Sequence, residues 1–319
     1  MQLLKSSLKS NRIATLAVIL LAMAYVVPEL IGGKLSVQTA SDMSSGNTAT
    51  KTKARQGQFD IASFDAALSE VSFQLDDIRD GGPVPRFYVD QIPADILDLS
   101  DVEKRKKTFI KLVLPQVLSV NEGIEVQRER LTGLLEKKAI GASLKENDRK
   151  WLQQLALRYR EETIDPEALM EKVDKIPVSI ALAQAVEESG WGTSRFAREG
   201  NALFGQRVWS TGGGIVPEDR SEDETHEVRA FKSIAESIRS YAHNLNVHPA
   251  YEDFREARAW SRTESNTETS GLQLIDTLHG YSEKGQEYVD NLRTLIQTNN
   301  FQDFEDAILM PEQLADNRP

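Results

Sequence analysis

The sequence predicts a mainly helical protein with a small β-hairpin lobe. Along most of the chain, apolar residues recur every three or four positions, which is the spacing of amphipathic helices. The exception lies between Trp209 and Phe231, where the short runs Ile215-Val216 and Val228 to Phe231 flank a polar, acidic turn. The glycines Gly212 to Gly214 precede these strand-like runs and predict a flexible entry into the lobe.

The N-terminus has the pattern of an export signal. Basic residues without acidic ones precede Ile13 to Val27, which is apolar except for Thr15. The run is short for a spanning helix, which needs about 20 apolar residues. Ala22-Met23-Ala24 offers a cleavage site, yet the apolar run continues beyond it. Residues 1–31 are therefore expected to be a retained signal-anchor in the inner membrane, with a cleaved signal peptide as the alternative.

The next two segments differ sharply in composition. Residues 32–57 are rich in Ser, Thr, Gly, Ala and Lys, with few large apolar side chains, which predicts a flexible linker. Residues 58–165 are expected to form a helical N-terminal extension. Its first helical pattern runs from Ile61 to Ile78, and Gly81 to Pro85 then breaks the chain.

Several local signals predict where further helices start. Capping boxes pair a serine with a glutamate three residues later, and they occur at Ser100 and Glu103, Ser143 and Glu146, and Ser233 and Glu236. Pro115 should kink or divide the first of these helices. Asp165 and Pro166 predict the start of a short helix, and Tyr288 to Ile296 have the spacing of the last one.

The segment from Pro177 to Gln206 carries the clearest chemical pattern. An apolar helix ends there in Glu187 and Glu188, and Gly, Trp, Asn and Phe follow at once. Glu188 lies on a small-residue face at the C-terminal end of the helix, where the macrodipole disfavours negative charge. This position, beside Glu187 and near Trp191, predicts a raised pKa for Glu188, as a proton donor near neutral pH requires. The alternative is a solvated pair on the last turn of an ordinary helix.

The sequence Glu-Ser-Gly-Trp-Gly at 188–192, followed by Gly-Asn-Ala-Leu-Phe-Gly at 200–205, resembles the signature of the bacterial glucosaminidases of glycoside hydrolase family 73. Ala202 departs from the asparagine common at that position. The similarity continues in the same order through Val228–Ser233 with Glu236–Tyr241, and through Tyr281–Glu283 with Tyr288-Val289. Upstream, 84–88 and 107–115 resemble the Bax-type proteins of Gram-negative bacteria, a branch of this family.

This resemblance implies a lysozyme-like catalytic domain over residues 166–303, with a groove between its two lobes and a tail at 304–319. It implies that Glu188 is the general acid and that Tyr281 orients the 2-acetamido group of the substrate. It also points to Glu218 as a second carboxylate. The other acidic residues of the lobe remain alternatives for that role, namely Asp219, Glu222, Asp223, Glu224 and Glu227. The substrate's own acetamido group is a further alternative as nucleophile.

Residues in and around the motifs are expected to bind the glycan. Flat rings cover the apolar faces of sugars well, although each ring could equally belong to the core. The candidate substrate-binding residues are Trp191, Asn201, Phe204, Trp209, Tyr241 and Tyr288.

Charge and composition narrow the partners. The formal net charge is −11 with no basic stripe, so a nucleic-acid partner is not expected. The chain has no cysteine, and its four histidines lack a zinc-binding spacing, so neither a metal nor a cofactor is expected. The expected function is an endo-β-N-acetylglucosaminidase that cuts peptidoglycan in the periplasm. The alternatives are a lytic transglycosylase of the same fold and a non-catalytic, membrane-anchored peptidoglycan-binding module.

Overall fold

A computed structural model describes residues 59–209, 212–218, 220, 225–264 and 270–312. Contacts divide the chain into two units, Met1–Ser45 and Gly46–Pro319, and the described residues all lie in the second. The expected signal or anchor at 1–31 and the linker at 32–57 lie outside the described residues. Within the described ranges, no helix is long and apolar enough to span a membrane.

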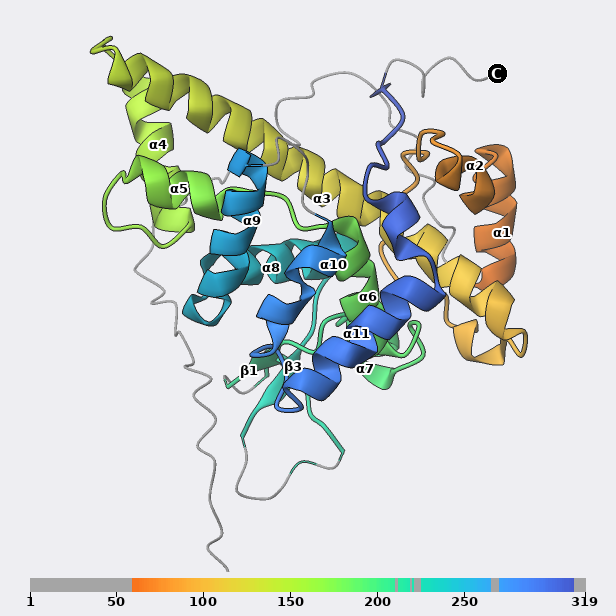
Figure 1. The fold of residues 1–319 in the computed structure, drawn as a ribbon. Helices are drawn as coiled ribbons and strands as arrows, with labels where there is room; N and C mark the ends of the chain where they lie inside the picture. The colour runs from red at the N-terminus through yellow and green to blue at the C-terminus, as the bar shows by residue number, and fades with distance from the viewer. Residues whose placement is uncertain (1–58, 210–211, 219, 221–224, 265–269, 313–319) are drawn as a thin grey trace, which may run out of the picture. The chain divides into compact units, whose positions relative to one another are not determined.

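The described unit is mainly helical and has one small antiparallel sheet (Figure 1). This confirms the predicted fold class. The helices are α1 (Ile61–Glu70), α2 (Leu75–Arg79), α3 (Val102–Ala139), α4 (Glu146–Arg158), α5 (Pro166–Lys172), α6 (Val178–Ser189), α7 (Arg195–Gly200), α8 (Ile234–Val247), α9 (Glu252–Glu264), α10 (Gly271–Leu274) and α11 (Gln286–Thr298). Short 3₁₀ helices are η2 (Ile96–Asp98), η3 (Pro249–Tyr251), η4 (Ile275–Leu278) and η5 (Phe301–Phe304).

The long helix α3 organises the core (Figure 1). It spans 38 residues, packs on both α6 and α8, and buries side chains such as Phe109, Val113 and Val117. Pro115 lies inside α3 and is buried, and the helix continues past it, so the expected division does not occur. Because α3 packs directly on α6, the N-terminal extension and the segment with the motifs share one hydrophobic core.

The helix starts agree only partly with the predicted capping boxes. Helix α8 begins after Ser233, whose side chain accepts from the Glu236 N–H at 3.2 Å. Helix α3 instead begins after Asp101, whose carboxylate accepts from the first-turn N–H groups. Helix α4 begins after Lys145 without a side-chain cap. An aspartate next to the predicted serine is an equally good cap, which is why the pattern misplaced the start of α3.

The β lobe has three strands where a hairpin was expected. The strands β1 (Arg207–Val208), β2 (Gly214–Ile215) and β3 (Glu227–Arg229) lie in the order β1-β3-β2, and both pairings are antiparallel. Two residues are too few to show an alternating pattern, so β1 gave no signal in the sequence.

Phe304, the last residue of η5, and Leu309 belong to the core, although both were expected to lie in a tail. Phe304 is fully buried, and Leu309 forms a parallel bridge with Val84 through two backbone hydrogen bonds of 2.8 Å. The Glu305 carboxylate accepts from the N–H of Val178 at 2.8 Å and of Gly271 at 2.7 Å, and thereby caps the N-terminus of α6. These are long-range contacts, which local sequence patterns do not report.

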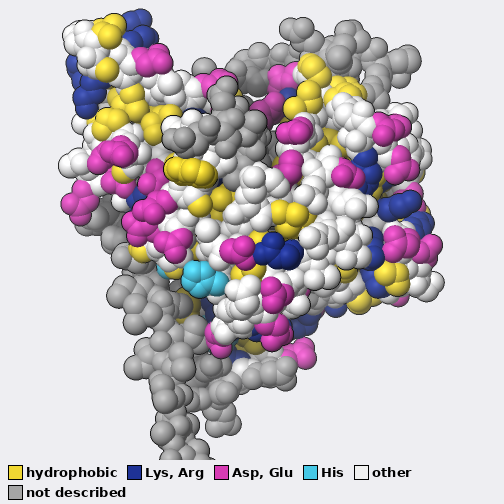
Figure 2. All heavy atoms as spheres, viewed as in Figure 1, with side chains coloured by type: hydrophobic (Ala, Val, Ile, Leu, Met, Phe, Trp, Pro, Cys, Tyr) yellow, Lys and Arg dark blue, Asp and Glu magenta, His cyan; other side chains and the backbone are white. Residues whose placement is uncertain are grey.

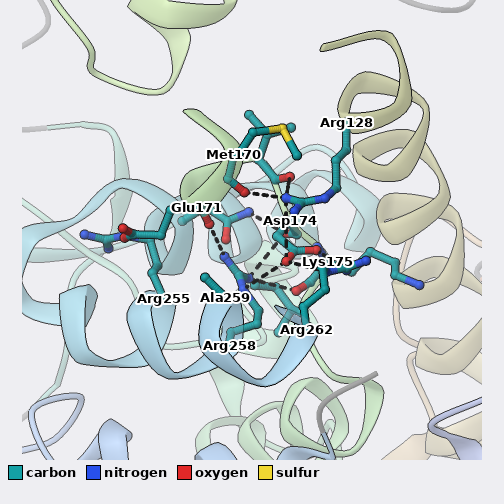
Figure 3. Close-up of polar contacts among 12 residues, drawn as sticks. Arg128, Met170, Glu171, Asp174, Lys175, Arg255, Arg258, Ala259 and Arg262 are labelled. Atoms are coloured by element: carbon teal, nitrogen blue, oxygen red, sulfur yellow. Dashed lines mark hydrogen bonds and ion pairs between the residues drawn. The ribbon is translucent and has the colours of Figure 1, made fainter. Parts of the chain in front are cut away.

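A buried ion cluster fixes the loop between α5 and α6 (Figure 3). Asp174 is 1% exposed and accepts from Arg262 of α9 at 2.5 and 3.1 Å. Arg258 of α9 donates to the Lys175 carbonyl at 2.8 Å, and Arg128 of α3 donates to the Val173 carbonyl at 2.8 Å. The loop that leads into α6 is therefore tied to both α3 and α9.

On the surface of the molecule, Asp and Glu side chains are spread over the face shown in Figure 2, in keeping with the net charge of −11.

Candidate active site

Glu188 lies on the last turn of α6, immediately before a sharp reversal of the chain. Gly190, Trp191 and Gly192 all have left-handed backbone conformations, with φ of +58°, +61° and +77°. The Ser189 hydroxyl holds this turn, since it donates to the Ala185 carbonyl at 2.5 Å and accepts from the Gly192 N–H at 3.0 Å. The glycines of the motif thus end the helix directly behind Glu188.

The surroundings of Glu188 favour its neutral form. The pKa of Glu188 is raised to about 7, mainly by burial and to a smaller extent by the neighbouring charge of Glu187. A hydrogen bond with the Tyr288 hydroxyl and the positive charges of Lys284 and Arg207 act in the opposite direction. A carboxyl group with a pKa near 7 is partly protonated at neutral pH and can donate a proton.

The second half of the motif packs directly against this carboxyl group. Gly205 has a φ of +59°, and a Cβ atom placed there would lie 3.0 Å from the Glu188 Oε2 atom. Only glycine therefore gives both the backbone conformation and the space that the carboxyl group occupies. This role of Gly205 was not predicted from the sequence, where it appeared only as a part of the motif.

Tyr281 lies beside the Phe204-Gly205 segment, which packs against Glu188. Its hydroxyl donates to the Phe204 carbonyl at 3.3 Å, and its ring stacks on that of Tyr288 with centroids 5.5 Å apart. The ring is half-buried. Burial and the nearby Tyr288 and Glu188 raise the pKa of Tyr281 well above its ordinary value, so the hydroxyl stays protonated.

Three of the expected substrate-binding rings lie in the core behind the site. Phe204, Tyr241 and Tyr288 are at most 2% exposed, so a sugar cannot stack on them in this structure. Phe204 and Tyr241 instead stack on each other at 3.8 Å. Asn201 is also buried; it caps α7 in a left-handed conformation and donates to the Phe231 carbonyl at 3.1 Å. These four residues shape the site from within.

The two tryptophans have different surroundings. Trp191 is half-buried, and its ring packs edge-on against Phe109 and at a tilt against Phe301, with the Lys106 ammonium 5.6 Å from the ring centroid. Trp209 follows β1 and is 39% exposed. Trp209 therefore has the most ring surface free for a ligand among the six candidate substrate-binding residues.

The acidic residues of the β lobe are only partly described. Glu218 is 80% exposed and pairs with the Arg195 guanidinium at 3.3 Å. Glu227 is buried and accepts from the N–H groups of Gly212 at 3.1 Å and Gly214 at 2.8 Å, which lowers its pKa. These bonds hold the glycine segment that was expected to be flexible. Asp219, Glu222, Asp223 and Glu224 lie outside the described residues.

Gln184 is a site residue that sequence analysis passed over. It lies one helical turn before Glu188 on α6, is fully buried, and hydrogen-bonds with Tyr241 and Tyr288. A polar residue four positions before the acid in an otherwise apolar helix was the available signal. Among the described residues, no group of three or more His, Cys, Asp or Glu side chains is arranged to hold a metal ion.

A cavity of 620 Å³ lies at the other end of α6. Its lining includes Ile176, Pro177 and Glu305, near the helix N-terminus, and does not include Glu188. The 12 residues of α6 extend over about 18 Å, so this cavity is distinct from the candidate active site.

Comparison with known proteins agrees with this assembly of motifs. The glucosaminidase family, described as mannosyl-glycoprotein endo-beta-N-acetylglucosaminidase, matches residues 167–301. Protein bax of Escherichia coli (strain K12) is 34% identical over 204 residues, which cover 61% of this chain and 70% of that protein. The crystal structure of the catalytic domain of the autolysin Auto from Listeria monocytogenes is similar over 54% of this chain and 96% of that domain, with 18% sequence identity and a TM-score of 0.32. On the basis of the two sequence matches, the chain belongs to the glucosaminidase family of glycoside hydrolases.

Proposed function

We propose that this protein is an endo-β-N-acetylglucosaminidase that hydrolyses β-1,4 bonds in the glycan strands of peptidoglycan, with Glu188 as the general acid. The observation that carries the proposal is the Glu188 carboxyl group, which is packed against Gly205 and has its pKa raised to about 7 by burial. Hydrolysis of a glycosidic bond requires such a neutral acid beside the leaving oxygen.

In the proposed reaction, Glu188 transfers its proton to the glycosidic oxygen as the bond from that oxygen to C1 breaks. Water adds its hydroxyl group to C1 and gives its remaining proton to a carboxylate, which is the ionised Glu188 where the acetamido group assists and the second carboxylate where one is used. A new reducing GlcNAc end results. The positive charge that develops at C1 needs a second group, either a carboxylate of the β lobe such as Glu218 or the acetamido oxygen of the substrate. The exposed position of Glu218 favours the acetamido route.

Tyr281 is the proposed partner of the acetamido group. Its hydroxyl stays protonated and lies next to the turn that contacts Glu188. When the substrate binds, this hydroxyl would turn the proton that it donates to the Phe204 carbonyl at 3.3 Å toward the acetamido group, and would hold that group in the orientation that brings its oxygen toward C1. Such a contact acts mainly in the transition state.

The test of the general acid is Glu188→Gln beside Glu187→Gln, assayed on purified peptidoglycan. Loss of the acid should lower kcat by about 10² to 10⁴ while the glycan still binds. Glu187→Gln is the control and should be mild, because adjacent helix residues point about 100° apart. Turnover near that of the wild type in Glu188→Gln would remove Glu188 from this role.

Mass spectrometry of the products decides between the proposal and a lytic transglycosylase. Reducing GlcNAc ends support hydrolysis by a glucosaminidase, whereas anhydro-muramyl ends support the transglycosylase. A protein that binds peptidoglycan and releases no fragments would be a binding module instead.

We also propose export to the periplasm, on the basis of the basic N-terminus and the apolar run Ile13 to Val27. An alkaline phosphatase fusion after Gln56 should be active in cells. An inactive fusion would contradict export, and the size of the mature protein would separate a cleaved signal from a retained anchor.

A further inference from the structure

The turn that follows Glu188 holds a bulky residue in a strained conformation. Trp191 has a φ of +61°, in the left-handed region that a tryptophan rarely adopts. Such a conformation persists only where the surrounding structure holds it. Gly190 and Gly192, on either side, adopt positive φ without this strain because they have no Cβ atom. The contacts of Trp191 therefore help to decide whether the turn keeps its shape.

The contacts of the Trp191 ring come from two other elements. The ring packs edge-on against Phe109 of α3, with centroids 5.9 Å apart, and at a tilt against Phe301 of η5, at 6.2 Å. Both phenylalanines are fully buried. The Lys106 ammonium, also from α3, lies 5.6 Å from the centroid of the Trp191 ring. The indole is therefore held by the N-terminal extension as well as by η5.

Phe109 also supports the backbone of the turn. A Cβ atom placed on Gly192 would lie 3.1 Å from Cδ2 and 3.2 Å from Cε2 of Phe109, so the glycine lets the backbone lie directly on the ring. The Gly192 N–H donates to the Ser189 hydroxyl at 3.0 Å, and Ser189 directly follows Glu188 on α6. An unbroken series of contacts thus leads from Phe109 through Gly192 to the residue next to Glu188.

We propose that Phe109 is a positioning residue, which holds Trp191 and Gly192 and thereby keeps Glu188 in place for proton transfer. The inference rests on the proposed role of Glu188 as general acid and concerns what holds that acid. Phe109 lies outside residues 167–301, which the glucosaminidase family matches. The N-terminal extension therefore supplies a part of the active site's support that the family segment lacks.

The test is Phe109→Leu in the full chain, assayed on purified peptidoglycan. Leucine keeps the position apolar but removes the ring that packs on Trp191 and Gly192. Proton transfer depends on the position of the acid to within about 1 Å, whereas binding of the glycan does not depend on Glu188 in this way. We expect kcat to fall at least about tenfold, ~1.4 kcal/mol of barrier, with KM within about twofold of the wild type.

Phe73→Leu is the matched control. Phe73 belongs to the same extension and is 1% exposed, and the Lys111 ammonium of α3 lies 5.6 Å from its ring centroid. Lys111 and Phe109 point about 200° apart around α3, so Phe73 packs on a different side of that helix. Phe73→Leu should also lower the melting temperature, but its kcat should stay that of the wild type. Equal losses of kcat in both variants would reflect a looser core and would overturn the proposal.

Gly192→Ala tests the same contact from the other side. Its methyl group would meet the Phe109 ring at 3.1 Å, and the alanine would be forced to a φ of +77°. Gly141→Ala is the control for strain, since φ is +75° there and no atom lies within 4 Å. We expect kcat to fall at least about tenfold in Gly192→Ala and to stay unchanged in Gly141→Ala. An unchanged kcat in Gly192→Ala would contradict the proposal.

The double variant Phe109→Leu with Gly192→Ala shows whether the two residues act through one contact. Leucine lacks the Cε2 atom and the rigid ring that the new methyl group would meet. The double variant should therefore lose less kcat than the product of the two separate losses. Losses that multiply would mean that the residues act independently, and would overturn the proposal. If Phe109→Leu does not fold, Phe109→Met takes its place, because its flexible side chain fills the space without a ring.

The split between kcat and KM separates this role from a role in binding. A rise in KM with kcat unchanged would mean that Phe109 and Trp191 support a glycan-binding surface, and would overturn the proposal. Failure of the general-acid role is seen separately, as activity that remains in Glu188→Gln. If Glu188→Gln is inactive and Phe109→Leu turns over like the wild type, the acid stands and the positioning role is lost.

Discussion

Burial of the Glu188 carboxyl group lowers the free energy of unfolding of this protein at neutral and alkaline pH. Burial favours the neutral form of Glu188, with a pKa of about 7 against an ordinary value of 4.5. Between these two pH values the unfolded chain ionises Glu188 while the folded chain does not, so stability falls as pH rises. Above about pH 7, the loss amounts to roughly 3 kcal/mol.

Glu188→Gln removes this cost because the amide has no charge to bury. We expect the variant and the wild type to unfold similarly near pH 4, and the variant to be the more stable at pH 8. Chemical denaturation of both proteins across this pH range measures the difference. A difference that does not change with pH would show that burial of the carboxylate has no such cost.

Gly205 sets the position of the Glu188 carboxyl group. Replacing Gly205 and a second glycine with positive φ distinguishes the effect of the contact with Glu188 from the effect of backbone strain. Gly205→Ala would place a Cβ atom 3.0 Å from Glu188 Oε2 and force a non-glycine residue to a φ of +59°. We expect about 1 kcal/mol of destabilisation from the strain and at least a tenfold loss of kcat from the displaced acid. The matched control is Gly141→Ala, where φ is +75° and no atom lies within 4 Å. Equal losses of activity in both variants would contradict this reading.

At the level of elements, the loop between α5 and α6 depends on the charge of Asp174. This carboxylate is 1% exposed and faces three arginines, and burial lowers the pKa of one of them, Arg258, to about 10. Asp174→Asn leaves the largely buried Arg128 and Arg258, and the more exposed Arg262, without their counter-charge, which typically costs about 3 to 5 kcal/mol.

Thermal unfolding of Asp174→Asn beside Asp276→Asn tests this expectation. Asp276 also forms a pair with an arginine, Arg293, at 2.7 Å, but its side chain is 66% exposed. The exposed pair should contribute about 1 kcal/mol or less. Similar stabilities for the two variants would mean that the buried cluster does not hold the loop.

Local sequence patterns predicted most of the helices, but they did not predict which residues of different helices contact one another. The periodicity of apolar residues indicated α1, α3, α4, α5, α6, α8 and α11, because one face of each packs on the core. It did not indicate α7, α10 or the two-residue strand β1, which are too short to show a period, and it also missed the longer helix α9. The motif pointed to Glu188 and Gly205 in the sequence. The hydrogen bonds of Gln184, by contrast, join residues 57 and 104 positions apart along the chain, and the arginines that face Asp174 lie 46 to 88 positions from it.

On the scale of the whole molecule, the C-terminal segment closes the described unit. Leu309 bridges to Val84 near the start of that unit, and Glu305 holds the N-terminus of α6, the helix that carries Glu188 at its other end. Burial raises the pKa of Glu305, and the hydrogen bonds that its carboxyl group accepts from Ser179 and from backbone N–H groups offset this effect only in part.

Glu305→Ala tests whether this closure stabilises the molecule. The variant leaves the N–H groups of Val178 and Gly271 without their acceptor, and each buried donor left unpaired costs about 1 to 3 kcal/mol. We expect a loss of at least about 2 kcal/mol in the free energy of unfolding, measured by urea denaturation. The adjacent, exposed Asp306→Ala is the matched control and should stay within about 0.5 kcal/mol of the wild type. Because Glu305 does not contact Glu188, the folded variant should keep its turnover. If Glu305→Ala is as stable as the wild type, the apolar contacts of Phe304 and Leu309, and not the hydrogen bonds of Glu305, hold the C-terminal segment in place.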